Sequence, residues 1–144
     1  DSCDRQGRND LQVNHWVVQM PHLVDAYLFY CEQDTSGDGL PLIEELPNEP
    51  VTPASIAKIE LVDIFSRRSA TLALCPNNLF PNETLIYHGC LGCSPVYPTI
   101  SISIRTLAAF RQSHRTCPHF TIQAQCKALR HLHHVSALST TLSI

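Results

Sequence analysis

Seven cysteines are the residues of this chain with the most distinctive chemistry. Thiols can bind zinc, act as nucleophiles or redox groups, or form disulfides. A structural zinc site needs two closely spaced pairs of ligands, and only Cys90 and Cys93 are that close together. The other five are spread out, as disulfide partners usually are: Cys3, Cys31, Cys75, Cys117 and Cys126. We therefore predict disulfides among these seven residues and an oxidising, extracellular location, with at least one cysteine left over.

The Cys90-Leu91-Gly92-Cys93 segment also has the spacing of a redox pair, in which a thiol at the start of a helix is acidified. Such a pair requires a helix directly after it. Pro95 and Pro98 stand where that helix would run. We therefore favour a structural role for this segment and keep a small redox protein as a third alternative.

The tripeptide Asn82-Glu83-Thr84 is the only N-x-[ST] sequon in the chain. In a secreted protein such a sequon is a candidate glycosylation acceptor, and it is expected in an exposed loop. The prediction that Asn82 carries a glycan agrees with the extracellular location inferred from the cysteines.

No motif in the sequence indicates catalysis. We find no paired carboxylates, nucleophile elbow, phosphate-binding loop or H-E-x-x-H helix. His131, His133 and His134 could bind zinc or, when protonated, a heparin-like polyanion. Because they lie in a polar tail, we interpret them as solvated. The sequence predicts a protein that is not an enzyme, with no cofactor and no metal site.

Composition places the chain among folded globular proteins. Of its 144 residues 44% are hydrophobic and 16% charged, which suits one domain, or one domain with an incomplete neighbour. The net charge of -3 gives no indication of a nucleic acid or an anionic membrane as partner. No apolar run reaches the length of a membrane span.

Hydrophobic alternation and turn residues predict strands in the first half of the chain. Residues 11–20 and 23–31 are rich in β-branched and aromatic side chains and are predicted as two strands, in a hairpin or as neighbours in a sheet. A proline-rich loop is expected at 32–53, followed by strands at 56–65 and 70–75. Without crossover helices between them, these strands are predicted to be antiparallel.

In the second half, residues 76–98 have the composition of a linker, with Leu85-Ile86-Tyr87 as a short extended piece. Residues 99–112 fit a strand or a helix, 120–124 fit a strand, and the chain beyond Leu132 is expected to be a loose tail. The predicted fold class is α+β, mostly β: a disulfide-stapled antiparallel sheet with at most one helix.

Two blocks of sequence resemble one known family. Cys75, followed by fourteen residues, Cys90-Leu91-Gly92-Cys93 and Leu107-Ala108-Ala109-Phe110, resembles the junction between cystatin domains in fetuins, kininogens and histidine-rich glycoprotein. Trp16-Val17-Val18 with Tyr27-Leu28 looks like the central strand pair of those domains. The resemblance covers about half of the chain. It implies a cystatin-like strand domain at 1–75, a Pro/Cys linker at 76–98, and a partial second domain with a loose tail at 99–144.

The resemblance implies a secreted glycoprotein that acts as a protease inhibitor or a carrier. The chain departs from the family at both inhibitory motifs, because no carboxylate lies between Cys90 and Cys93 and the stretch 15–19 lacks the Q-x-V-x-G pattern. Contacts to a protease or another protein partner are expected at His15, Trp16, Val17, Val18, Gln19, Leu91 and Gly92. The alternative is an all-β, disulfide-rich receptor-binding module, on a cell surface or a virus, without inhibitory activity.

Overall fold

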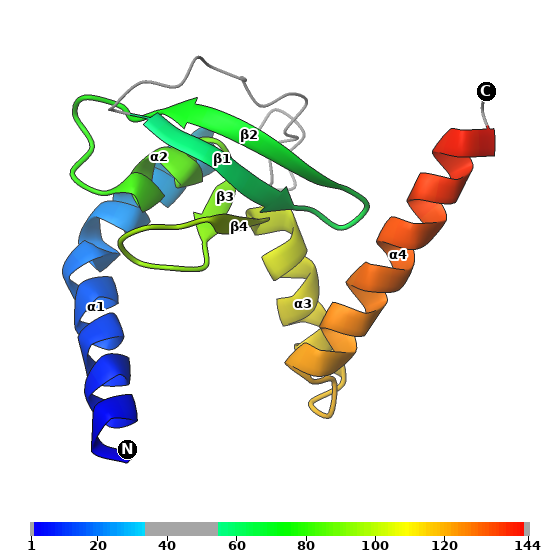
Figure 1. Ribbon diagram of the computed structural model, residues 1–144, viewed down its shortest axis with the longest axis horizontal. Helices are drawn as coiled ribbons and strands as arrows, with labels where there is room; N and C mark the ends of the chain where they lie inside the picture. Colours follow the sequence, from blue (N-terminus) through cyan, green and yellow to red (C-terminus); the bar gives the residue numbers. More distant parts are fainter. Residues whose placement is uncertain (1, 34–54, 143–144) are drawn as a thin grey trace.

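The computed structural model describes residues 2–33 and 55–142, and within them the protein is α+β with four helices and a four-stranded mixed sheet (Figure 1). The prediction of a mostly β, antiparallel, disulfide-stapled fold with at most one helix was wrong. The predicted loop at 32–53 lies almost entirely outside the described residues. In chain order the elements are α1 (Ser2–Glu32), β1 (Ser55–Val62), β2 (Arg67–Ala73), α2 (Pro81–Tyr87), β3 (Cys90–Gly92), β4 (Ile100–Ser103), α3 (Ile104–Thr116) and α4 (Ile122–Leu142).

The strand order in the sheet is β2-β1-β4-β3. The pairs β1–β2 and β3–β4 are antiparallel, whereas β1 and β4 are parallel, with Glu60 opposite Ile100. The strands predicted at 56–65 and 70–75 are confirmed as β1 and β2, with ends shifted by a few residues. The parallel pair needs a crossover connection, and α2 and β3 lie within it. Segments before, within and after 76–98 thus all contribute strands to one sheet.

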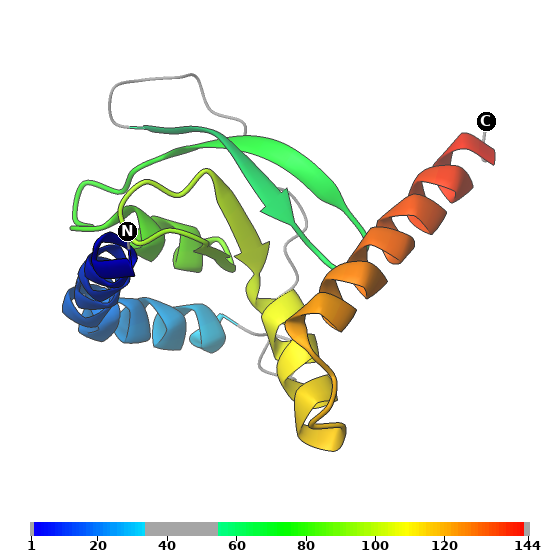
Figure 2. The same ribbon diagram turned by 60° about the horizontal axis from the view of Figure 1, so that its bottom comes forward.

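Residues 11–20 and 23–31 form the long helix α1, so the predicted hairpin was wrong. Leu23, Ala26 and Tyr30 recur at helical spacing and are buried on its inner side. Pro21 lies within the helix and leaves the Val17 carbonyl without its intrahelical donor. Val17 is exposed, so water can satisfy that carbonyl. Figure 2 shows that α1 changes direction along its length, as expected for a helix with an internal proline.

The short helix α2 connects the two halves of the core, so the extended piece predicted at 85–87 was wrong. Leu85 packs in a buried cluster with the sheet residues Ile59 and Leu72. Its neighbour Ile86 packs on the opposite side with Leu23 and Ala26 of α1. The layers therefore run from the sheet through α2 to α1.

The ambiguous segment 99–112 contains both predicted structures in succession, because β4 runs directly into α3. The strand expected at 120–124 and the loose tail beyond Leu132 were wrong, since α4 occupies Ile122–Leu142. Figures 1 and 2 show α4 extending away from the sheet.

The cysteines with described side chains are all free thiols, so the disulfide prediction was wrong for them: Cys31, Cys75, Cys90, Cys93, Cys117 and Cys126. The side chain of Cys3 lies outside the described part of the chain. Among the described helices, none has both the length and the hydrophobicity needed to cross a membrane.

Candidate binding surfaces

The three residues of the sequon are buried in α2 rather than exposed in a loop. Asn82 has no exposed surface. Its side-chain amide donates to the carbonyl oxygens of Ser94 at 3.0 Å and Pro95 at 3.2 Å, and its Oδ1 accepts from the Gly92 N–H at 2.9 Å. Glycosylation of Asn82 stays a prediction. A glycan on Nδ2 would replace one of its two hydrogens and so remove at least one of the bonds to Ser94 and Pro95.

The other two sequon residues hold the start of α2. One carboxylate oxygen of Glu83 accepts from the backbone N–H groups of Leu79 and Phe80, both at 2.8 Å, and so caps the helix. Thr84 Oγ1 accepts from the backbone of Cys75 at 3.3 Å and from Asn78 Nδ2 at 3.0 Å. The tripeptide therefore fixes α2 to the segments on either side of it.

The C-x-x-C segment packs directly against Asn82. A Cβ atom at Gly92 would lie 2.5 Å from Asn82 Oδ1 and 2.6 Å from Pro98 Cβ, so only glycine fits there. Cys90 is buried in the sheet cluster, and burial raises the pKa of its thiol to about 12. A redox pair needs the opposite, an acidified thiol. The geometry of this segment is that of a packed β-strand.

The predicted contact stretch 15–19 lies on α1 and forms no hairpin. Gln19 is buried, and its Nε2 donates to the Pro95 carbonyl at 2.7 Å, which ties α1 to the loop that Asn82 also binds. Val17 and Val18 are exposed, and His15 is half-buried. Of the predicted contact residues, the structure brings Trp16 and Leu91 together, because both line the same hollow between α1 and α3.

That hollow, called the α1–α3 groove below, has a volume of about 300 Å³ and an almost wholly apolar lining. Its walls combine two long helices with the core between them. The lining residues are Trp16, Met20, Leu23, Val24, Tyr27, Ile86, Leu91, Ile104 and Leu107. The pKa of Tyr27 is raised, chiefly by its hydrogen bond with Cys31 and by burial, and the nearby Arg111 guanidinium opposes that shift. Arg111 follows the groove residue Leu107 by four positions, so it lies on the same face of α3.

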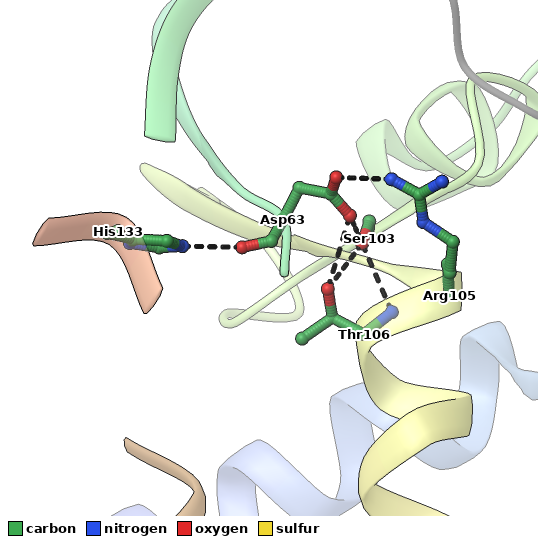
Figure 3. Close-up of polar contacts among 5 residues, drawn as sticks. All are labelled: Asp63, Ser103, Arg105, Thr106 and His133. Atoms are coloured by element: carbon green, nitrogen blue, oxygen red, sulfur yellow. Dashed lines mark hydrogen bonds and ion pairs between the residues drawn. The ribbon is translucent and has the colours of Figure 1, made fainter. Parts of the chain in front are cut away.

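Asp63, directly after β1, holds the start of α3 in place (Figure 3). Its carboxylate accepts hydrogen bonds from the Ser103 hydroxyl at 2.6 Å and the Thr106 hydroxyl at 3.3 Å, and it forms an ion pair with Arg105. Ser103 is also the N-cap of α3. Burial acts to raise the pKa of Asp63, but the hydrogen bonds from Ser103 and Arg105 outweigh it and hold that pKa below its ordinary value.

The same residue fixes α4. His133 Nε2 donates to the backbone carbonyl of Asp63 at 2.6 Å, since a carbonyl can only accept (Figure 3). Although a serine, a histidine and an aspartate meet here, Ser103 is almost fully buried and its hydroxyl donates to Asp63, not to an imidazole. The cluster lacks the nucleophile–base hydrogen bond of an acyl-transfer site. Its observed contacts anchor two helices.

Charge is strongly segregated along the chain. No aspartate or glutamate occurs between residues 99 and 144, although that segment contains five of the ten lysines and arginines. On α4, Lys127, Arg130, His131 and His134 line a hollow of about 420 Å³. Sequence reasoning based on the net charge of -3 missed this surface, because the aspartates and glutamates, which all lie within 1–98, outnumber the lysines and arginines of the whole chain. Counting charges by segment would have found it.

Comparison with known proteins gives no match: no family model, no curated protein and no solved structure is similar to this chain at a significant level. The resemblance to cystatin domains therefore stays a prediction. Within the described residues, no group of three or more histidine, cysteine, aspartate or glutamate side chains is placed to hold a metal ion.

Proposed function

We propose that this protein is a binding module whose α1–α3 groove receives an amphipathic helix of a protein partner. The observation that carries the proposal is a nearly all-apolar hollow flanked by half-exposed hydrophobic side chains on α1. Binding of an apolar helix face in a hydrophobic groove is a common mode of peptide recognition. Pockets of this size with few polar groups favour binding through buried apolar area.

The spacing on α1 supports a helix as the occupant. Apolar side chains recur at intervals of four and three residues, from Val13 through Val17, Met20, Val24 and Tyr27 to Cys31. The first five of these side chains are 40–64% exposed, so the stripe is largely uncovered. A 4-3 repeat is typical of helices that pack knobs-into-holes against another helix. A helix laid in the groove would cover this stripe and the facing Leu107.

The charge of the opposite wall indicates which helix fits. α3 carries Arg105, Arg111 and Arg115 and no acidic residue. Arg105 is already paired with Asp63, whereas Arg111 is exposed and lies one helical turn after the groove residue Leu107. A partner helix with acidic residues along the edge that faces α3 would gain complementary contacts and a faster association. We therefore assign an acid-flanked amphipathic helix as the occupant.

This proposal keeps the expected role in binding a protein but not protease inhibition through the stretch 15–19. The stretch 15–19 is helical, and Gln19 is buried and hydrogen-bonded within the core. It offers no hairpin tip to a protease cleft. Secretion and a protease target stay hypotheses that no contact in the described residues supports.

Trp16 gives a direct test, because it is the only tryptophan and lines the groove. Two tryptophan-free peptides of roughly 18 residues would be titrated, sharing an apolar i, i+3, i+4, i+7 stripe but with acidic or basic flanks. We expect the acid-flanked peptide to shift the Trp16 emission to shorter wavelength with saturation. The basic-flanked peptide should bind at least ~10-fold more weakly.

Absence of a saturable shift with either peptide up to ~1 mM would overturn the proposal. Equal binding of both peptides would overturn the charge assignment. Sedimentation velocity of the chain alone measures whether it self-associates. A concentration-dependent dimer that protects Trp16 would make a second copy the occupant and would contradict a foreign helix.

A further inference from the structure

One face of α4 carries a row of basic side chains that the groove proposal does not use. Lys127, Arg130, His131 and His134 are spaced i, i+3, i+4 and i+7, so they lie on one side of the helix. Together they line one hollow of about 420 Å³. Lys127 and Arg130 are exposed, and neither forms an ion pair with any described residue.

An adjoining side of α4 faces the body of the protein. A second hollow, at the end of the β1–β2 hairpin, is lined by Val62, Arg67, Cys126, Lys127, Leu129, Arg130 and His133. The hydrogen bond from His133 to the Asp63 carbonyl fixes this side. Lys127 and Arg130 lie at the border between the two hollows, and all four side chains of the row are exposed.

The surroundings of the basic row contain no compensating charge on its own or the preceding helix. Neither α3 nor α4 has an acidic residue, and the loop between them adds none. α4, which projects from the sheet in Figure 1, therefore carries two formal positive charges, on Lys127 and Arg130, and no negative one. Such a concentrated field attracts a polyanion irrespective of the net charge of the whole chain.

We propose that α4 is a nucleic-acid-binding element that contacts the phosphate backbone of a duplex through its basic row. A helix that projects from the body, as α4 does in Figures 1 and 2, can enter a major groove about 12 Å wide. The row from Lys127 to His134 spans ~10 Å of helix axis, enough to contact successive phosphates. Lysine and arginine neutralise phosphates, and imidazole N–H groups donate hydrogen bonds to them.

This inference departs from the expectation of no nucleic-acid partner, which depended on the net charge of the whole chain. It involves residues that do not line the α1–α3 groove, so the two proposals are independent and either can fail while the other holds. Backbone contacts of this kind carry no sequence information, and the binding should be independent of sequence.

The test is fluorescence anisotropy of the full chain with a labelled duplex DNA of random sequence across a range of salt concentrations. Lys127→Ala combined with Arg130→Ala removes two exposed cations from α4. The matched control, Arg5→Ala combined with Arg8→Ala, removes two exposed cations from α1. All four side chains are exposed, and far-UV circular dichroism verifies that both variants keep the native helical content.

We expect the α4 variant to lose affinity on the order of 100-fold at 50 mM salt and its salt slope to become shallower by about 1.8. The α1 control should stay within about twofold of the native chain, because its cations lie outside the contact. No binding at 50 mM salt, or equal losses in the two variants, would overturn the inference. Binding of heparin with a higher affinity than duplex DNA would overturn the assignment to nucleic acid.

Discussion

Replacing Asn82 by alanine should destabilise the protein by about 3 kcal/mol. The change leaves the buried N–H of Gly92 without a partner, at a cost of ~2–3 kcal/mol. The Ser94 carbonyl is half-buried and partly reached by water, so its lost bond adds only ~1 kcal/mol. The Pro95 carbonyl still accepts from Gln19. Alanine is the better helix former by ~0.5 kcal/mol, which offsets a small part of the loss.

Urea unfolding followed by far-UV circular dichroism measures this difference in protein from a host that does not glycosylate. Thr84→Ser is the matched control, because it keeps both the sequon and the hydroxyl that accepts from Cys75 and Asn78. It should cost about 1 kcal/mol for one buried methyl group. An Asn82→Ala variant within ~0.5 kcal/mol of the native protein would refute the argument, since it predicts two lost partners. A glycan detected on Asn82 in the folded chain would also refute the argument.

Three further outcomes test the packing and the electrostatics. Gly92→Ala should destabilise by at least ~3 kcal/mol, and by ~1 kcal/mol less when Asn82→Ala removes one of its two close contacts. The pKa of Asp63 is lowered, so its ionised form stabilises the native state above about pH 4, and this contribution is lost as the pH falls through the folded-state pKa. Asp63→Asn should therefore flatten the acid dependence of the urea midpoint, and an unchanged profile would contradict this. With Ellman's reagent, Cys117→Ser should remove one fast-reacting thiol and Cys90→Ser none, because Cys117 is exposed whereas Cys90 is buried with its pKa raised to about 12.

Local sequence patterns predicted the strands β1 and β2 correctly but gave a wrong prediction for α1. Alternation along 56–65 is a property of the strand itself, so it is visible in sequence. In α1, Val17, Val18 and Pro21 suggested two strands, although Leu23, Ala26 and Tyr30 already had helical spacing. An exposed carbonyl makes Pro21 tolerable there, and exposure depends on the tertiary structure.

Motifs of chemical modification were misleading for a related reason. The sequon and the C-x-x-C motif are defined by residue types and their spacing, and neither indicates whether the residues are buried. The contact between Asn82 and Gly92 joins α2 to β3 and exists only once those elements pack. No short sequence pattern distinguishes an asparagine that forms such a buried hydrogen bond from one that accepts a glycan. The groove residues Trp16 and Leu91 were both predicted as contacts, but Trp16 from a hairpin that does not form and Leu91 from a linker that is part of the sheet.

The most direct test of the α1–α3 groove compares two substitutions of the same residue type on one helix. Val24 lines the groove, whereas Val18 is exposed outside it. Binding of the acid-flanked peptide would be measured by Trp16 emission in Val24→Glu and Val18→Glu. We predict at least ~10-fold weaker binding for Val24→Glu, from a lost apolar contact and a like charge, and native affinity for Val18→Glu. Equal affinities in the two variants would contradict the groove as the binding site.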